Sequence, residues 1–87
     1  MRRETEWNGT PMMIERITLD PAVMGGKPCI RGLRITAGAI VSLVASGCDF
    51  GEILDAYPDL ERDDIIAALQ YAAWRLQNEQ DVWLKAS

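Results

Sequence analysis

The chain has 87 residues, of which 48% are hydrophobic and 25% are charged, and these ordinary values for a single globular domain exclude a wholly disordered protein. There is no histidine, and the two cysteines, Cys29 and Cys48, form neither a zinc-binding spacing nor a CxxC redox motif. A net charge of −4 is unfavourable for sequence-independent binding of nucleic acid, which depends on an excess of Lys and Arg.

Charge is distributed unevenly along the chain. Residues 1–34 hold six basic and four acidic side chains, which gives +2, whereas residues 35–87 hold three basic and nine acidic ones, which gives −6. The two halves are therefore expected to face different kinds of partner.

The N-terminal segment, 1–12, is polar and contains the turn-forming residues Asn8, Gly9 and Pro11, so it is predicted to be a flexible arm. It has no apolar stretch of the length that a signal peptide or a membrane span requires. We therefore expect a cytoplasmic protein with reduced thiols and no membrane contact, in which both cysteines are small core residues.

Two short strands are predicted next. The segment 13–20 alternates apolar and polar residues until Pro21 ends it, and the segment 29–35 forms a second strand that Gly32 interrupts with a bulge or bend. Paired together, the two strands make a short N-terminal β-hairpin.

Two helices with clear end signals follow the strands. Thr36 is a suitable N-cap for a helix over 37–46, which Gly47 ends. Asp49, with Glu52 three residues later, has the spacing of a capping box for a second helix over 50–57, which the following proline ends.

The third helix is predicted to begin near Glu61 and to carry apolar residues on one face. The C-terminal tail, 77–87, contains no Gly or Pro and is compatible with a continuation of this helix to Leu84. Residues 13–76 are expected to form a single α+β domain, mainly α, with a three-helix core of the homeodomain-like or winged helix-turn-helix type. Because so small a core is marginal, and pairing of edge strands removes an exposed edge, a homodimer is expected.

The stretch GGKPCIRGLRIT, at 25–36, combines three glycines with basic side chains. It is not a P-loop, because a proline stands five residues before Gly26, and Pro28, which has no N–H, occupies the position of the Ser or Thr. The glycines are better explained as turn residues with positive φ.

Lys27, Arg31 and Arg34 form a candidate phosphate-binding strip within this stretch. The interruption at Gly32 leaves open whether Arg31 and Arg34 share a surface. Solvated charges, some of them paired with the protein's own acids, explain the strip equally well.

Arg62 is a further candidate DNA contact, because it lies at the start of the third helix, where a recognition helix meets the bases. Its neighbours Glu61, Asp63 and Asp64 repel the DNA backbone. A capped helix packed in the core is therefore the better explanation of this segment.

Large apolar side chains recur near the C-terminus in otherwise polar surroundings, at Trp74, Trp83 and Leu84. Because Trp is enriched at the centres of protein interfaces, we predict that these residues bind a partner protein. The alternative is that both tryptophans close the domain's own core.

No constellation for catalysis is apparent. The chain lacks histidine, neither cysteine has a neighbouring base, and adjacent Asp63 and Asp64 point about 100° apart on a helix. Solubility and helix capping explain Asp55, Asp59 and Asp63 better than a metal site does. We therefore expect no enzyme activity, no cofactor and no metal.

The segment RITLDPAVMGGKPCIRGLRIT, followed by GCDFGEILDAYPDLERDDIIAALQYAAW, resembles the bacterial family called domain of unknown function 433. The combination of GKPCIRG-x-RI, E-I-L-x-x-Y-P and a later A-L-x-Y-A is more specific than any one of these pieces. Glu61 departs from the family pattern, in which a Thr caps the third helix.

This resemblance implies an antitoxin of a type II toxin–antitoxin module of the VapBC kind. Such a protein binds and neutralises a PIN-like ribonuclease toxin, and represses its own operon by binding operator DNA. In this interpretation Trp74, Trp83 and Leu84 anchor the toxin, while Lys27, Arg31 and Arg34 contact phosphate. The alternative is a stand-alone helix-turn-helix regulator without a toxin partner.

Overall fold

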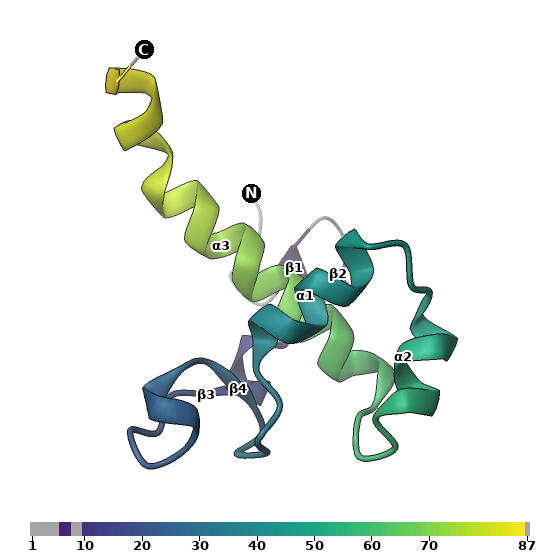
Figure 1. The fold of residues 1–87 in the computed structure, drawn as a ribbon. Coiled ribbons are helices and arrows are strands. Elements are labelled where there is room, and N and C mark those ends of the chain that lie inside the picture. Colours follow the sequence, from purple (N-terminus) through teal and green to yellow (C-terminus); the bar gives the residue numbers. More distant parts are fainter. Residues whose placement is uncertain (1–5, 8–9, 87) are drawn as a thin grey trace.

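The computed structural model describes the backbone of residues 6–7 and 10–86, and the side chains of residues 11–77. Very short strands and 3-10 turns precede three α-helices in the chain (Figure 1). The elements are β1 (Glu6–Trp7), β2 (Thr10–Pro11), the 3-10 turn η1 (Ile14–Arg16), β3 (Ile17–Thr18), the 3-10 turn η2 (Met24–Gly26), β4 (Cys29–Ile30), α1 (Ala37–Ala45), α2 (Phe50–Ala56) and α3 (Arg62–Ala86).

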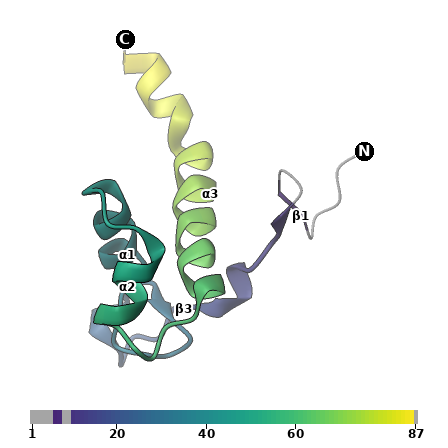
Figure 2. The ribbon, with the colours of Figure 1, turned by 90° about the vertical axis from the view of Figure 1, so that its right-hand side faces the viewer.

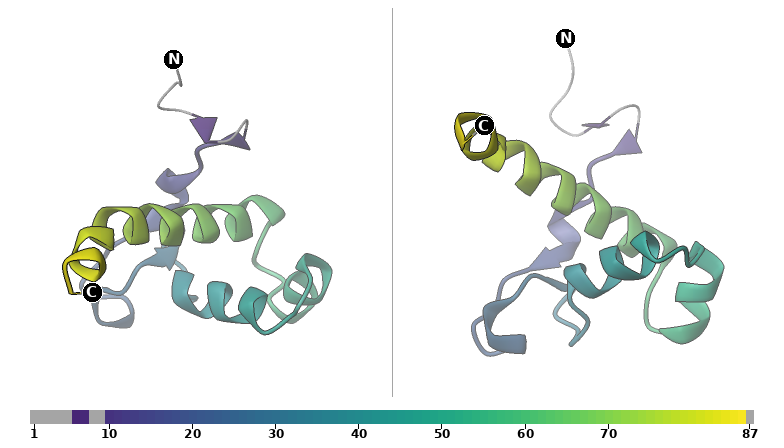
Figure 3. Two further views of the ribbon diagram at one scale, coloured as in Figure 1. Left: turned by 90° about the horizontal axis from the view of Figure 1, so that it is seen from above. Right: turned by 45° about the horizontal axis from the view of Figure 1, so that its top comes forward.

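The predicted fold class is confirmed, since the chain is mainly helical with three helices and short antiparallel strand pairs at its N-terminal end. Helix α3 is the central element: α1 and α2 lie along one side of it, and the N-terminal segment crosses the other side (Figures 2 and 3). The core lies mainly between α3 and the α1–α2 pair. Its buried side chains are Ile30, Ala37, Ile40, Ile53, Leu60, Ile65 and Ala68.

The helix ends lie within one or two residues of the predicted positions, because local side chains fix them. Thr36 caps α1, its Oγ1 accepting a hydrogen bond of 3.1 Å from the N–H of Ala39. At α2 both bonds of the capping box are formed: the N–H of Glu52 donates to Asp49 (2.8 Å), and the N–H of Asp49 donates to Glu52 (2.9 Å).

The strand predictions are only partly right. In the segment 13–20, Ile14–Arg16 is a 3-10 turn, and only Ile17–Thr18 pairs as β3 with β4. The N–H of Arg16 closes this turn by donating to the carbonyl of Met13 (3.0 Å), and the N–H of Met13 donates to the side chain of Gln70 on α3 (2.8 Å).

The second predicted strand is a tight hairpin instead of one strand over 29–35. Arg31 and Gly32 both have positive φ, +45° and +74°, and the N–H of Leu33 donates to the carbonyl of Ile30 (2.7 Å). These are the features of a type I′ turn, which reverses the chain so that the N–H of Ile30 reaches the carbonyl of Ile35 (3.0 Å).

The predicted N-terminal arm, 1–12, contains an antiparallel pair in which Glu6 and Trp7 of β1 stand opposite Pro11 and Thr10 of β2. Residues 1–5 and 8–9 lie outside the described part of the chain. In the C-terminal tail, the backbone of α3 continues to Ala86. Among the described residues, no helix combines the length and apolar character needed to cross a membrane.

Candidate functional site

Asp64 is the centre of a charged cluster at the start of α3. Its side chain is completely buried, and both oxygens are bound by Arg31: Nε donates to Oδ1 (3.0 Å) and Nη2 donates to Oδ2 (2.9 Å). Arg16 donates to Oδ1 (2.8 Å), and the backbone N–H of Glu61 donates to Oδ2 (2.8 Å). The carboxylate therefore ties three segments together: η1, the β-turn and the first turn of α3.

Asp64 also takes part in capping α3. It occupies the third helical position, and its bond to the N–H of Glu61 is the half of a capping box in which the side chain reaches back to the cap residue. Arg31 also binds the segment just before α3, because its Nη2 donates to the carbonyl of Asp59 (2.8 Å).

The surroundings of Asp64 favour its charged form. Burial raises the pKa of this carboxyl, but the hydrogen bonds from Arg31, from the N–H of Glu61 and from Arg16 outweigh it and hold the pKa below its ordinary value of 3.8. In return, Glu61 and then Asp64 raise the pKa of Arg16, and Asp64 raises that of Arg31. All three groups are therefore charged at neutral pH.

This cluster separates the residues of the predicted phosphate-binding strip. Arg31 is committed to Asp64, although 37% of its side chain is exposed, so phosphate binding there competes with the ion pair. Lys27 and Arg34 are exposed. Lys27 directly follows η2, and Arg34 comes after the hairpin turn at Arg31 and Gly32. Both segments lie at the end of the molecule away from the C-terminus of α3 (Figure 1).

Arg62 lies exposed on the first turn of α3, with its guanidinium 5.4 Å from the centre of the Phe50 ring. The helix that follows is poorly placed to enter a DNA groove. Five of its residues are buried, and at about 100° per residue they span more than half of the helix circumference. This is because α3 is covered by α1 and α2 on one side and by the N-terminal segment on the other. The buried residues are Asp64, Ile65, Ala67, Ala68 and Gln70. The interpretation of α3 as a core helix is therefore the one that fits.

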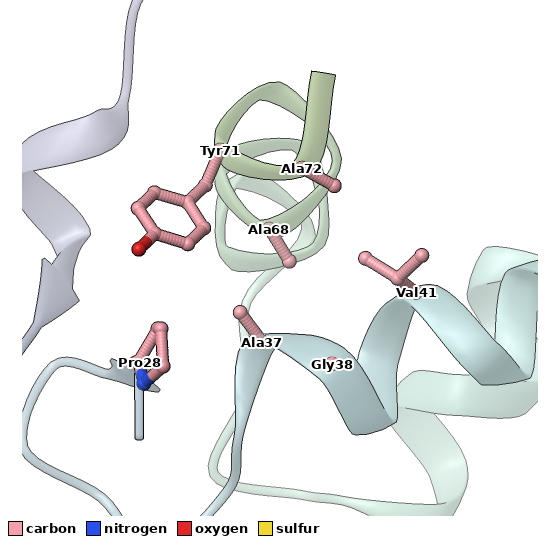
Figure 4. A pocket seen from close by; sticks show the side chains of 7 residues that line it. All are labelled: Pro28, Ala37, Gly38, Val41, Ala68, Tyr71 and Ala72. Carbon is pink, nitrogen blue, oxygen red and sulfur yellow. The ribbon is translucent and has the colours of Figure 1, made fainter. Parts of the chain in front are cut away.

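An apolar groove lies between α1 and α3. Its volume is about 260 Å³, and Figure 4 shows side chains from both helices and from the segment before β4 around it. The lining residues are Pro28, Ala37, Gly38, Val41, Ala68, Tyr71 and Ala72. The hydroxyl of Tyr71 is the polar side-chain group in this lining, so the groove suits an apolar side chain of a binding partner.

Beyond the groove, α3 projects away from the rest of the fold (Figures 1 and 2). Trp74 and Leu76 are exposed here, at 48% and 67%, and the Trp74 ring lies 6.2 Å from that of Tyr71. The predicted anchors Trp83 and Leu84 lie on the last turns of α3, but their side chains lie outside the part that the structure describes. Trp74 is therefore about half exposed beside Tyr71, which packs against the core, and both interpretations of this side chain stay predictions.

Sequence reasoning missed two buried polar residues. Gln70 is 2% exposed; its amide accepts a bond from the N–H of Met13 (2.8 Å) and donates one to the carbonyl of Pro11 (2.9 Å), which fastens the N-terminal segment to α3. Asp64 was expected to repel DNA at the start of the third helix, not to be a buried ion-pair partner. The sequence signal for both residues was their position among apolar residues of α3, such as Ile65 and Ala68. They stand on faces that are normally polar and exposed when a helix is covered on one side only, so their burial was not expected.

The acids considered as a metal site do not form one. Within the described part of the chain, no three Cys, Asp or Glu side chains come close enough together to hold a metal ion, and this includes Asp55, Asp59 and Asp63.

Comparison with known proteins gives consistent relationships. The family model described as "Protein of unknown function (DUF433)" matches residues 17–72. The chain is 34% identical over 58 residues to the uncharacterized protein y4eO of Sinorhizobium fredii, an alignment that covers 67% of this chain and 26% of that protein. The chain thus spans about a quarter of the length of this curated relative.

A solved structure shares the fold. The crystal structure of a DUF433 member protein from Anabaena variabilis, at 2.00 Å resolution, matches with a TM-score of 0.63 and 32% sequence identity, over 83% of this chain and 69% of that one. The matched segment, 17–72, contains Arg31, Asp64 and all the lining residues of the groove between α1 and α3. This chain belongs to the DUF433 family.

Proposed function

We propose that this protein is a non-catalytic, antitoxin-like module that binds and neutralises a PIN-like ribonuclease through its projecting helix. The observation that carries the proposal is the course of α3, which leaves the core with Trp74 and Leu76 exposed on it. A projecting helix segment gains little stability alone, and docking against a partner protein buries its exposed apolar side chains. Trp83 and Leu84, further along the same helix, remain predicted anchors.

The arrangement of charge supports a protein partner more than DNA. Two basic side chains of the N-terminal half, Arg16 and Arg31, are engaged with Asp64. Glu61 and Asp63 stand at the start of α3, where a recognition helix meets the bases, and their charge repels the DNA backbone. The net charge of −6 over residues 35–87 instead complements the cationic surface that a ribonuclease presents to RNA.

DNA binding takes a secondary place in the proposal. Lys27 and Arg34 remain for phosphate contact, and Arg62 adds a third exposed cation. If these three cations contact phosphate, the logarithm of the affinity for operator DNA falls with the logarithm of the salt concentration with a slope of only about −3. A stand-alone DNA-binding regulator is the competing function.

The test is capture of the partner. The tagged chain is co-expressed with the open reading frame beside its gene, purified, and assayed for a bound protein and for inhibition of that protein's RNA cleavage. Trp74→Ala with Leu76→Ala is expected to lower capture at least about tenfold, because truncating central interface aromatics costs 2 kcal/mol or more. Trp83→Ala with Leu84→Ala tests the distal anchors separately.

Glu15→Ala with Leu19→Ala, at exposed positions outside both the projecting end of α3 and the acidic segment 35–87, is the matched control and retains capture. The proposal fails if no nuclease is captured, or if this control loses capture as much as the α3 variants do. In that case operator binding is measured against salt. Lys27→Ala with Arg34→Ala is expected to reduce the salt slope by about 2 if these residues contact phosphate.

A further inference from the structure

The outer surface of α1 carries no charge. From residue 35 to residue 48 the sequence contains no Asp, Glu, Lys or Arg, although a quarter of the whole chain is charged. A surface helix normally presents charged or polar side chains to water. The exposed residues of this helix and its C-cap are all small and uncharged: Gly38, Ala39, Ser42, Ala45 and Ser46.

This uncharged face is continuous with the apolar groove. Gly38 belongs to both, since it is exposed on α1 and also lines the groove with Val41. Across the groove stand Tyr71 and Ala72 of α3 (Figure 4). The two features together make one uncharged surface, from the outside of α1 to α3, which no other described segment covers.

We propose that this surface binds a second copy of the same chain, with the two α1 helices packed against each other across a two-fold axis. In such a contact the same patch serves both subunits, and residues near the axis meet their own counterparts. A charge there faces an identical charge, which destabilises the pair. For a chain with a net charge of −4, an uncharged face is the one that two copies bring together without this repulsion.

The chemistry of the surface argues against the other classes of occupant. Nucleic acid requires Lys or Arg, and a cationic toxin surface is matched by acids, but the segment 35–48 contains neither. The described strands are also poor dimer contacts, because each is two residues long. Gly38 and Ser42 lie one turn apart on the same side of α1, so a second helix can approach closely along this line.

The inference does not depend on the proposed toxin, so it is tested on the purified chain alone by size-exclusion chromatography with light scattering. The wild-type protein is expected to elute as a dimer with twice the chain mass of 9.7 kDa. Ser42→Glu and Ser42→Lys are each expected to give a monomer, because either charge meets itself across the axis. An equimolar mixture of the two variants is expected to restore the dimer, because Glu then faces Lys.

Restoration by mixing separates a lost interface from a lost fold, and circular dichroism confirms that each variant is folded. The pair Ala45→Glu and Ala45→Lys repeats the test at a second exposed position, and Asp55→Lys on α2 is the control that leaves the dimer intact. The proposal is overturned if the wild-type protein is a monomer at about 100 μM, or if both charged variants remain dimers. It is also overturned if folded variants stay monomeric on mixing, or if Ser42→Glu abolishes capture of the neighbouring protein while the dimer persists.

Discussion

Arg31 donates hydrogen bonds from Nε and Nη2 to the carboxylate of Asp64, which lies 33 residues later in the sequence. Arg31 stands in a turn in which its own φ is +45°. Left-handed backbone is unfavourable for a residue with a Cβ, whereas the adjacent Gly32 adopts it freely. The bidentate bond to a buried carboxylate offsets this conformational cost. One residue thus fixes both the hairpin turn and the first turn of α3.

Replacing Asp64 by Asn is expected to lower the free energy of unfolding by about 2–3 kcal/mol, less than for a fully buried pair because Arg16 and Arg31 are partly exposed. The variant leaves two guanidinium groups without their shared carboxylate. Urea unfolding followed by circular dichroism measures the loss. Asp63→Asn, at a side chain that is 45% exposed, is the matched control and is expected to stay within about 0.5 kcal/mol of the wild type. Equal effects of the two substitutions contradict the role given to Asp64.

Acid sensitivity is a second consequence of this carboxylate. The pKa of Asp64 is lower in the folded protein than its ordinary value of 3.8, so in acid the unfolded chain binds this proton first. The stabilisation is complete above the ordinary value and is lost as the pH falls through the folded pKa. The wild-type protein is therefore expected to lose more stability than Asp64→Asn between pH 5 and pH 3, as measured by urea midpoints. Parallel curves for the two proteins contradict this assignment.

The strained turn can be separated from the ion pair. Arg31→Ala and Arg31→Gly both remove the guanidinium, but only glycine relieves the left-handed backbone. We expect Arg31→Gly to be more stable than Arg31→Ala by about 1 kcal/mol, and both to be less stable than the wild type. Thermal or urea unfolding of the three proteins decides this. If Arg31→Ala is more stable than Arg31→Gly, the left-handed backbone at residue 31 does not destabilise the protein as proposed.

Gln70 is expected to hold the N-terminal segment in place. Gln70→Leu keeps the size of the side chain but leaves the N–H of Met13 and the carbonyl of Pro11 without their partner, at a cost of about 1–3 kcal/mol. Hydrogen exchange should become faster at Met13 before it does in the centre of α3. Gln77→Leu, at an exposed position on the same helix, is the control and should leave the exchange of Met13 unchanged.

The sequence by itself determined the features that nearest neighbours along the chain control. The caps at Thr36 and Asp49, the helix ends at Gly47 and Pro58, and the bend at Gly32 follow from bonds within a few residues or from the allowed φ of one residue. They are visible without a fold because the interacting groups are close in sequence.

Only the tertiary structure decided which charged and polar groups are paired. From the sequence alone, nothing distinguishes Arg16, Arg31 and Arg34, which are the same residue type in one basic segment. In the fold, α3 passes the hairpin so that Asp64 pairs with Arg16 and Arg31, whereas Arg34 is exposed. The bond between Gln70 and Met13 spans 57 residues, and the groove requires α1 and α3 to pack. These features depend on where distant segments meet, and that is set by burial of the shared core, which no local spacing encodes.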